Sequence, residues 1–109
     1  MARVYIDVPK STADQKNNLA AAFLKAMDES FPEGENGVIV TEYRVKFADG
    51  VANENHGTIA ALLEGECTSA AKIEEVSIPM TVATHEIYGD NYVFNLIYHE
   101  LTADQIVEL

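Results

Sequence analysis

The sequence lacks the features that would place it in a membrane or outside the cell. Its single cysteine, Cys67, excludes an intrachain disulfide and any site built from several thiolates, and a lone reduced thiol is typical of a cytoplasmic protein. The longest apolar segments are far shorter than the roughly 20 residues that span a bilayer, and no basic stretch precedes an apolar run at the N-terminus. We therefore expect a cytoplasmic protein with no membrane partner.

Positive charge is also scarce. Seven lysines and arginines stand against 18 aspartates and glutamates, which gives a net charge of −11. Such a chain repels nucleic-acid phosphates and anionic lipid, so we expect no nucleic acid as a partner. An acidic surface could instead engage a basic surface on another protein, which leaves a non-enzymatic acidic binding or inhibitor protein as an alternative function. With 109 residues, the chain is expected to form a single domain, 1–109.

The first half of the chain has the pattern of a strand, a helix and a second strand. Residues 4–8 are rich in β-branched and aromatic side chains, and Ser11 and Thr12 follow at capping-box distance from polar partners. After a cluster of proline and glycine, residues 38–47 predict a second strand, which can lie parallel to the first. Between the strands, apolar residues recur at three- and four-residue steps, as one face of a helix requires: Leu19, Ala22, Phe23, Ala26, Met27 and Phe31.

The second half has weaker signals. Residues 58–67 fit both a helical stripe and a buried strand, and we favour the helix. Residues 78–101 are interpreted as a hairpin that turns at Gly89, Asp90 and Asn91. Residues 102–105 repeat a capping pattern and predict a terminal helical turn. The sequence therefore predicts an α+β fold with a β-α-β opening unit, a mixed sheet and a C-terminal β-hairpin. The apolar face of that hairpin would carry Met80, Val82, Tyr88, Tyr92, Phe94, Leu96 and Tyr98.

The histidines do not indicate a metal site. In the predicted hairpin, His85 and His99 lie roughly 13 Å apart at about 3.3 Å per residue, too far to share one ion. His56 could approach only from a loop. No glycine-rich phosphate loop follows a predicted strand, and paired carboxylates are as common as an acidic chain makes them. We expect no metal and no cofactor.

One stretch is more specific. The segment VYIDVPKSTADQKNNLAAAFLKAM, followed by GVIVTEY, resembles the β-α-β unit of the tautomerase superfamily, typified by oxalocrotonate tautomerase and macrophage migration inhibitory factor. In that family, the unit opens with a catalytic N-terminal proline, then a short strand, a turn with a basic residue and a capped amphipathic helix. The resemblance covers about residues 2–47. It implies a tautomerase-like fold assembled as a homotrimer or hexamer, with activity on a small enolisable keto acid.

Carried onto this chain, the resemblance implies roles for individual residues. Ala2 stands at the catalytic proline, Lys10 where a substrate-binding arginine often occurs, and Phe47 near a hydrophobic position of the site. Gly37 stands where a second arginine can occur. Removal of the initiator methionine would leave Ala2 with a free amine of intrinsic pKa about 7.7–8.0, which can act as a base. A primary amine is a poorer catalyst than proline, and one cation stabilises a dicarboxylate less well than two, so the activity is expected to be weakened or lost.

Overall fold

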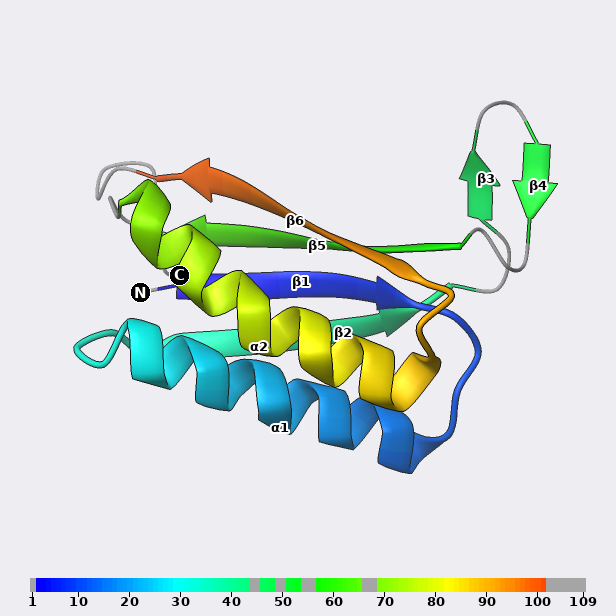
Figure 1. Cartoon of the computed structure of the whole chain (residues 1–109), viewed down its shortest axis with the longest axis horizontal. Coiled ribbons are helices and arrows are strands. Elements are labelled where there is room, and N and C mark those ends of the chain that lie inside the picture. The colour runs from blue at the N-terminus through cyan, green and yellow to red at the C-terminus, as the bar shows by residue number, and fades with distance from the viewer. Residues whose placement is uncertain (1, 44–45, 49–50, 54–56, 66–68, 102–109) are drawn as a thin grey trace, which may run out of the picture.

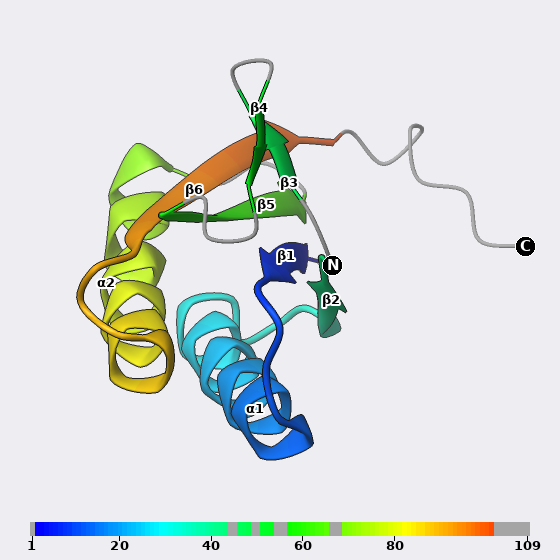
Figure 2. The ribbon, with the colours of Figure 1, turned by 90° about the vertical axis from the view of Figure 1, so that its right-hand side faces the viewer.

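The computed structural model describes residues 2–43, 46–48, 51–53, 57–65 and 69–101. Among these residues, the helices α1 (Ala13–Ser30) and α2 (Ala70–Tyr88) cover one face of a four-stranded sheet (Figures 1 and 2). The strand order of this sheet is β2-β1-β5-β6, and the short strands β3 and β4 pair with each other in a separate ribbon. The strands are β1 (Ala2–Val8), β2 (Asn36–Glu42), β3 (Lys46–Ala48), β4 (Val51–Asn53), β5 (Thr58–Gly65) and β6 (Val93–Glu100).

The main sheet consists of two β-α-β units. In the first, β1 and β2 are parallel and joined through α1; in the second, β5 and β6 are parallel and joined through α2. The central strands β1 and β5 run antiparallel, with Ala2 opposite Gly65. The sheet is therefore mixed, and the predicted α+β class with a β-α-β opening unit is confirmed.

Helix α1 begins as the sequence predicts. The Thr12 side-chain oxygen accepts from the backbone N–H of Gln15 at 3.1 Å, and the Gln15 side chain accepts from the backbone N–H of Thr12 at 2.9 Å. This reciprocal pair is a capping box, which satisfies two donors that the first turn leaves free. The predicted apolar stripe is also confirmed, since Leu19, Phe23, Ala26 and Met27 are buried against the sheet.

The predicted C-terminal hairpin is wrong. Residues 70–88 form helix α2, with Ser69 as its N-cap, and β6 follows after a turn at Gly89, whose φ is +105°. The predicted hairpin residues therefore belong to two different elements, since Met80 and Val82 lie on α2 and Phe94 lies on β6. On α2 they do not share a face, because Met80 is buried and Val82 is 51% exposed. A parallel pair needs a crossover, and α2 is the crossover between β5 and β6.

Two further expectations are corrected. Residues 58–65 form strand β5, not a helix, and alternate residues, Ile59, Ala61 and Leu63, point into the core. The single strand predicted over residues 38–47 is also wrong, because β2 ends at Glu42 and Lys46–Ala48 belongs to the separate ribbon. The helical turn predicted at residues 102–105 lies outside the described residues.

The core lies between the sheet and the helices and joins both units. The ring of Phe23 on α1 meets the ring of Phe94 on β6 edge to face, with centroids 5.7 Å apart. The opposite face of the sheet is not covered by a helix of the described chain, and its large apolar residues Ile39, Val93 and Ile97 are 43%, 58% and 58% exposed. No described helix is both long and apolar enough to cross a bilayer.

Candidate functional site

Ala2 opens the central strand β1 between two partners. Its Cα partners are Asn36 on β2 and Gly65 on β5, and the residue is 8% exposed. The side-chain amide of Asn36 donates to the Asp28 carboxylate at 2.9 Å and to the carbonyl of Phe31 at 3.0 Å. Pairing with a strand on each side fixes the backbone of Ala2, so the sheet also fixes the position of the Ala2 nitrogen.

Arg3 follows Ala2 and projects to the uncovered face of the sheet, where it is exposed. Its side chain lies across Gly37, so that a Cβ added at Gly37 would be 3.6 Å from the Arg3 Nε. On the other side, the Cα partner of Arg3 is Glu64, whose carboxylate lies 3.7 Å from Nδ1 of His99. Arg3 was not among the predicted site residues; its position directly after Ala2 in an alternating strand is the signal that the sequence offers for it.

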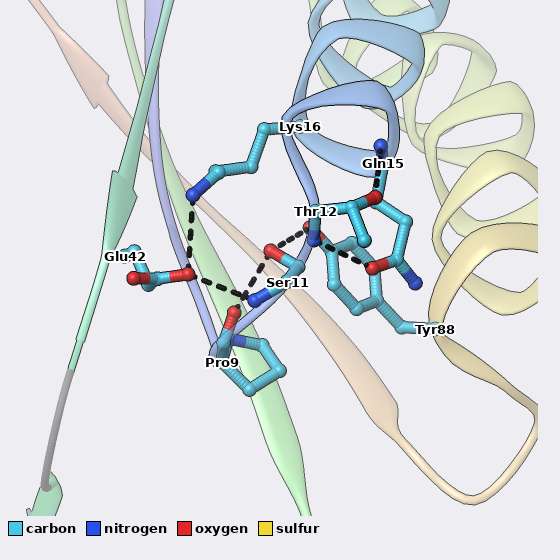
Figure 3. A network of polar contacts seen from close by, with 7 residues as sticks. All are labelled: Pro9, Ser11, Thr12, Gln15, Lys16, Glu42 and Tyr88. Atoms are coloured by element: carbon cyan, nitrogen blue, oxygen red, sulfur yellow. Dashed lines mark hydrogen bonds and ion pairs between the residues drawn. The ribbon is translucent and has the colours of Figure 1, made fainter.

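Lys10 lies at the other end of β1, in a turn held by a network of polar contacts (Figure 3). The Ser11 hydroxyl donates to the carbonyl of Pro9 at 3.0 Å, and the Ser11 backbone N–H donates to Oε1 of Glu42 at 2.8 Å. The Lys16 ammonium also donates to Oε1 of Glu42, at 3.1 Å. Lys10 itself is exposed and makes no hydrogen bond or ion pair with any residue that the structure describes, so its ammonium is available to a ligand.

The same network connects the turn to the end of α2. The Tyr88 hydroxyl donates to Oγ of Ser11 at 3.1 Å, and the Gln15 side chain donates to the carbonyl of Ile87 at 3.3 Å. The hydrogen bond from the Ser11 backbone and that from Lys16 hold the pKa of Glu42 below its usual range. Burial raises the pKa of Tyr88. The turn that carries Lys10 is thus fixed by both helices and by β2.

The three predicted site residues do not come together within one chain. Ala2 and Val8 mark the two ends of β1, about 20 Å apart at about 3.3 Å per residue, and Lys10 lies beyond Val8. Phe47 lies on β3, at the same end of the sheet as the Lys10 turn (Figure 1). The position of the Phe47 side chain is outside what the structure describes.

A groove of about 540 Å³ lies between α2 and β6, away from Ala2, Lys10 and Phe47. Its apolar lining comes from Ile73 on α2 and from the β6 residues Phe94, Leu96 and Ile97. The edge of β6 next to it pairs with no other strand in the described part of the chain. Such an edge can accept a strand from another chain.

The contacts of His85 and His99 differ from those expected in the predicted hairpin. His85 lies on α2, with Nε2 2.8 Å from the carbonyl oxygen of Tyr92, and His99 lies on β6 beside Glu64. The separation of roughly 13 Å expected from the hairpin register is therefore wrong in its premise, because His85 and His99 are not on paired strands. In the described parts of the chain, no three histidine, cysteine or acidic side chains converge as metal ligands would.

Comparison of this fold with solved structures identifies a consistent group. Native fused 4-OT superposes with a TM-score of 0.81 at 8% identity, over 97% of this chain and 91% of that chain. A macrophage migration inhibitory factor-like protein from Entamoeba histolytica superposes with a TM-score of 0.80 at 14% identity, over 98% of this chain and 94% of that chain. A wild-type fused 4-OT in an asymmetric trimer has a TM-score of 0.79 at 6% identity, over 97% and 91% of the two chains.

No protein-family model matches the sequence, and neither does any curated protein. The structural matches cover almost the whole chain, whereas the resemblance in the sequence covers only residues 2–47. The tautomerase-like fold is therefore confirmed, including the second half, where the sequence showed no repeat of the unit. Sequence identities this low show the fold, and function must be argued from the site.

Proposed function

We propose that this chain is a tautomerase or isomerase that acts on a small enolisable keto acid, with the α-amine of Ala2 as its base. The observation that carries this proposal is the position of Ala2. It begins the central strand of a tautomerase-like sheet and is held between Asn36 and Gly65. The proposal requires that Met1 be removed, so that the nitrogen of Ala2 is a free amine.

In the proposed reaction, the neutral amine takes a proton from the carbon beside the substrate carbonyl. The electron pair of that C–H bond forms the C=C bond of an enolate, and negative charge develops on the carbonyl oxygen. The resulting ammonium returns the proton to the substrate at oxygen or at another carbon. Cations near the substrate carboxylate and the enolate oxygen lower the energy of this charged intermediate.

Lys10 is proposed to bind the substrate carboxylate, and Phe47 to line the pocket. Both lie at the opposite end of the sheet from Ala2, so a site that contains all three residues requires a second copy of the chain. We therefore propose a homo-oligomer, a trimer or hexamer. The unpaired edge of β6 and the exposed residue Ile97 on that strand are surfaces that such an assembly would bury.

Charge distribution supports an anionic substrate. Two of the seven cationic residues of this acidic chain follow the end of β1: Lys10 in the exposed turn and Lys16 in the first part of α1, where it pairs with Glu42. The exposed ammonium of Lys10, in a chain of net charge −11, is a local positive charge that attracts a carboxylate to that end of the sheet.

The proposal is tested by replacing the proposed base. Intact mass must first show that Met1 is absent. Ketonisation of enol-phenylpyruvate, followed by ultraviolet absorbance, is expected to be weak in the native chain and to rise on Ala2→Pro, because the pyrrolidine ring holds the secondary amine of proline in one orientation, whereas the primary amine of Ala2 rotates freely. Acetylation of the amine should abolish the activity. Lys10→Ala should raise KM about tenfold through loss of a charge-assisted hydrogen bond, and Lys25→Ala, on the exposed face of α1, serves as the control.

The contrary result is equally clear. If Ala2→Pro confers no keto–enol activity and acetylation changes nothing, Ala2 is structural and the proposed activity is wrong. Light scattering that shows only a monomer at micromolar concentration would remove the shared site with Lys10 and Phe47.

A non-enzymatic acidic binding protein is the second candidate, and the outer face of α2 favours it. Ile78 and Val82 are 66% and 51% exposed there, one helical turn apart. Between Ile73 and Leu101 the chain has no lysine or arginine, whereas Glu74, Glu75 and Glu86 lie on α2. Salt-sensitive binding of a basic protein, lost on Ile78→Lys, would support this function.

A further inference from the structure

The uncovered face of the sheet carries a cation directly beside the proposed base. Arg3 is the next residue after Ala2, on the same central strand, and its side chain is exposed. By contrast, Lys10 is more than the length of β1 away from Ala2 within the chain. Arg3 is thus the cation that one subunit itself supplies next to the amine.

The Arg3 side chain packs beside Gly37 on the neighbouring strand. Gly37 is the Cα partner of Arg3 on β2, and an added Cβ there would lie 3.6 Å from Nε and 3.8 Å from Cγ of Arg3. These are ordinary van der Waals distances, so the stem of Arg3 packs next to Gly37 and a Cβ there would contact it. Gly37 was expected to leave the site without a second cation; in the structure, the side chain of Arg3 lies next to Gly37.

The guanidinium is also available. Arg3 makes no ion pair with any residue that the structure describes, although Glu64 is its Cα partner on β5. The Glu64 carboxylate lies instead 3.7 Å from Nδ1 of His99. An exposed arginine without a carboxylate partner offers a planar pair of N–H donors, which matches the two oxygens of a carboxylate.

We infer that Arg3, whose side chain packs beside Gly37, binds a carboxylate group of the substrate on the uncovered face of the sheet. It thereby selects keto acids over neutral ketones. This inference rests on the proposed function, because it places the bound carboxylate beside the amine of Ala2. It assigns to Arg3 the role of a second cation, in addition to Lys10, so that a dicarboxylate would be bound at both ends.

Binding of oxalate, a dicarboxylate that cannot enolise, tests the inference without turnover. In the native chain with Met1 removed, oxalate is expected to shift the ¹⁵N signal of the Arg3 Nε. Arg3→Gln should weaken oxalate binding about tenfold, as expected for the loss of a charge-assisted pair at an exposed site. Lys25→Gln removes the same charge from the exposed face of α1 and is the matched control, with little change expected.

A second variant separates the position of the Arg3 side chain from its charge. Gly37→Val keeps Arg3 but adds two methyl groups to a Cβ that would already contact the Arg3 stem, and a β-branched residue suits a strand with no positive φ at this position. By crowding the Arg3 side chain, it should weaken oxalate binding, but less than Arg3→Gln does, while the chain remains folded by circular dichroism. For a turned-over substrate, Arg3→Gln should raise KM for a keto acid and leave KM for its neutral ester unchanged.

The outcomes separate the inference from the proposed function. Oxalate binding that depends on Arg3 and Gly37, in a chain with no keto–enol activity, would support the carboxylate site and contradict the tautomerase. If the chain has keto–enol activity but Arg3→Gln changes neither oxalate binding nor KM, the proposed tautomerase function stands and the proposed role of Arg3 is wrong. Equal weakening by Arg3→Gln and Lys25→Gln would also overturn it, because the effect would then be one of net charge.

Discussion

The two β-α-β units of the sheet have the same architecture but different local sequence signals. Helix α1 begins with a complete capping box between Thr12 and Gln15, whereas the N-cap Ser69 of α2 has Lys72 three residues later, which cannot return the hydrogen bond. Helix α2 also contains Pro79 in its middle. Its remaining sequence is rich in β-branched residues, which lower helix propensity: Ile73, Val76, Ile78, Thr81, Val82, Thr84 and Ile87.

The units also differ in how deeply they are buried. On β1, Val4, Ile6 and Val8 are at most 1% exposed, because β1 lies between two strands and under the helices. On the edge strand β6, Phe94, Leu96 and Tyr98 are only partly buried. The comparison indicates that local signals specify the first unit, whereas packing against the first unit stabilises the second.

The largest effect is expected where the two units meet. Phe23→Ala should lower the free energy of unfolding by about 3–5 kcal/mol, because it leaves a cavity in the core and removes the ring contact with Phe94. Lys25→Ala, on the exposed face of the same helix, should change it by less than about 0.5 kcal/mol. Urea denaturation measures both, and equal effects would contradict the assigned packing face of α1.

Pro79 tests whether α2 carries an unfavourable local sequence. Proline inside a helix removes the hydrogen bond to the carbonyl four residues earlier, that of Glu75, and its ring crowds that carbonyl. Pro79→Ala should therefore raise the free energy of unfolding by about 1–3 kcal/mol. Pro9→Ala, in the turn after β1, should give no such gain. If Pro79→Ala destabilises the protein, the proline contributes packing that outweighs its cost to the helix.

The two N-caps compare the helices directly. Thr12→Ala removes the side-chain oxygen of a reciprocal box and should cost about 1–2 kcal/mol, whereas Ser69→Ala removes a single bond to the N–H of Lys72 and should cost about 0.5–1 kcal/mol. Thermal and urea unfolding of both variants, with Asn17→Ala as an exposed helical control, gives the comparison. A larger loss for Ser69→Ala would reverse the ranking of the local signals.

The smallest effect concerns Glu42, which ties the first unit to the Lys10 turn. Because the folded pKa of Glu42 is lowered, its contribution to stability is present above its unfolded pKa and is lost as the pH falls through the folded pKa. The difference in Tm between the native chain and Glu42→Gln should therefore be largest near pH 7 and shrink toward pH 3. Glu29→Gln on the exposed face of α1 is the control, and a difference independent of pH would contradict this assignment.

The candidate site, like the fold, could be predicted from the sequence only in part. The resemblance in the sequence pointed to Ala2, Lys10 and Phe47, and these remain proposals, because the structure places Ala2 at one end of β1 and the other two at the opposite end. Arg3 was not predicted, since an isolated arginine in an alternating strand is most simply a solvent-exposed residue. Its relation to Gly37 depends on the register between β1 and β2, which one sequence does not show.

By itself, the sequence determined the first β-α-β unit, because capping groups, helical periodicity and chain breakers act between residues close in the chain. It also determined the α+β class and the resemblance that the fold confirms. Only the tertiary structure decided that residues 70–88 are a helix and residues 58–65 a strand. In those segments, propensity and periodicity conflict, and the free energy gained by burying Val76 and Met80 of α2 and Ile59 of β5 in the shared core selects the outcome.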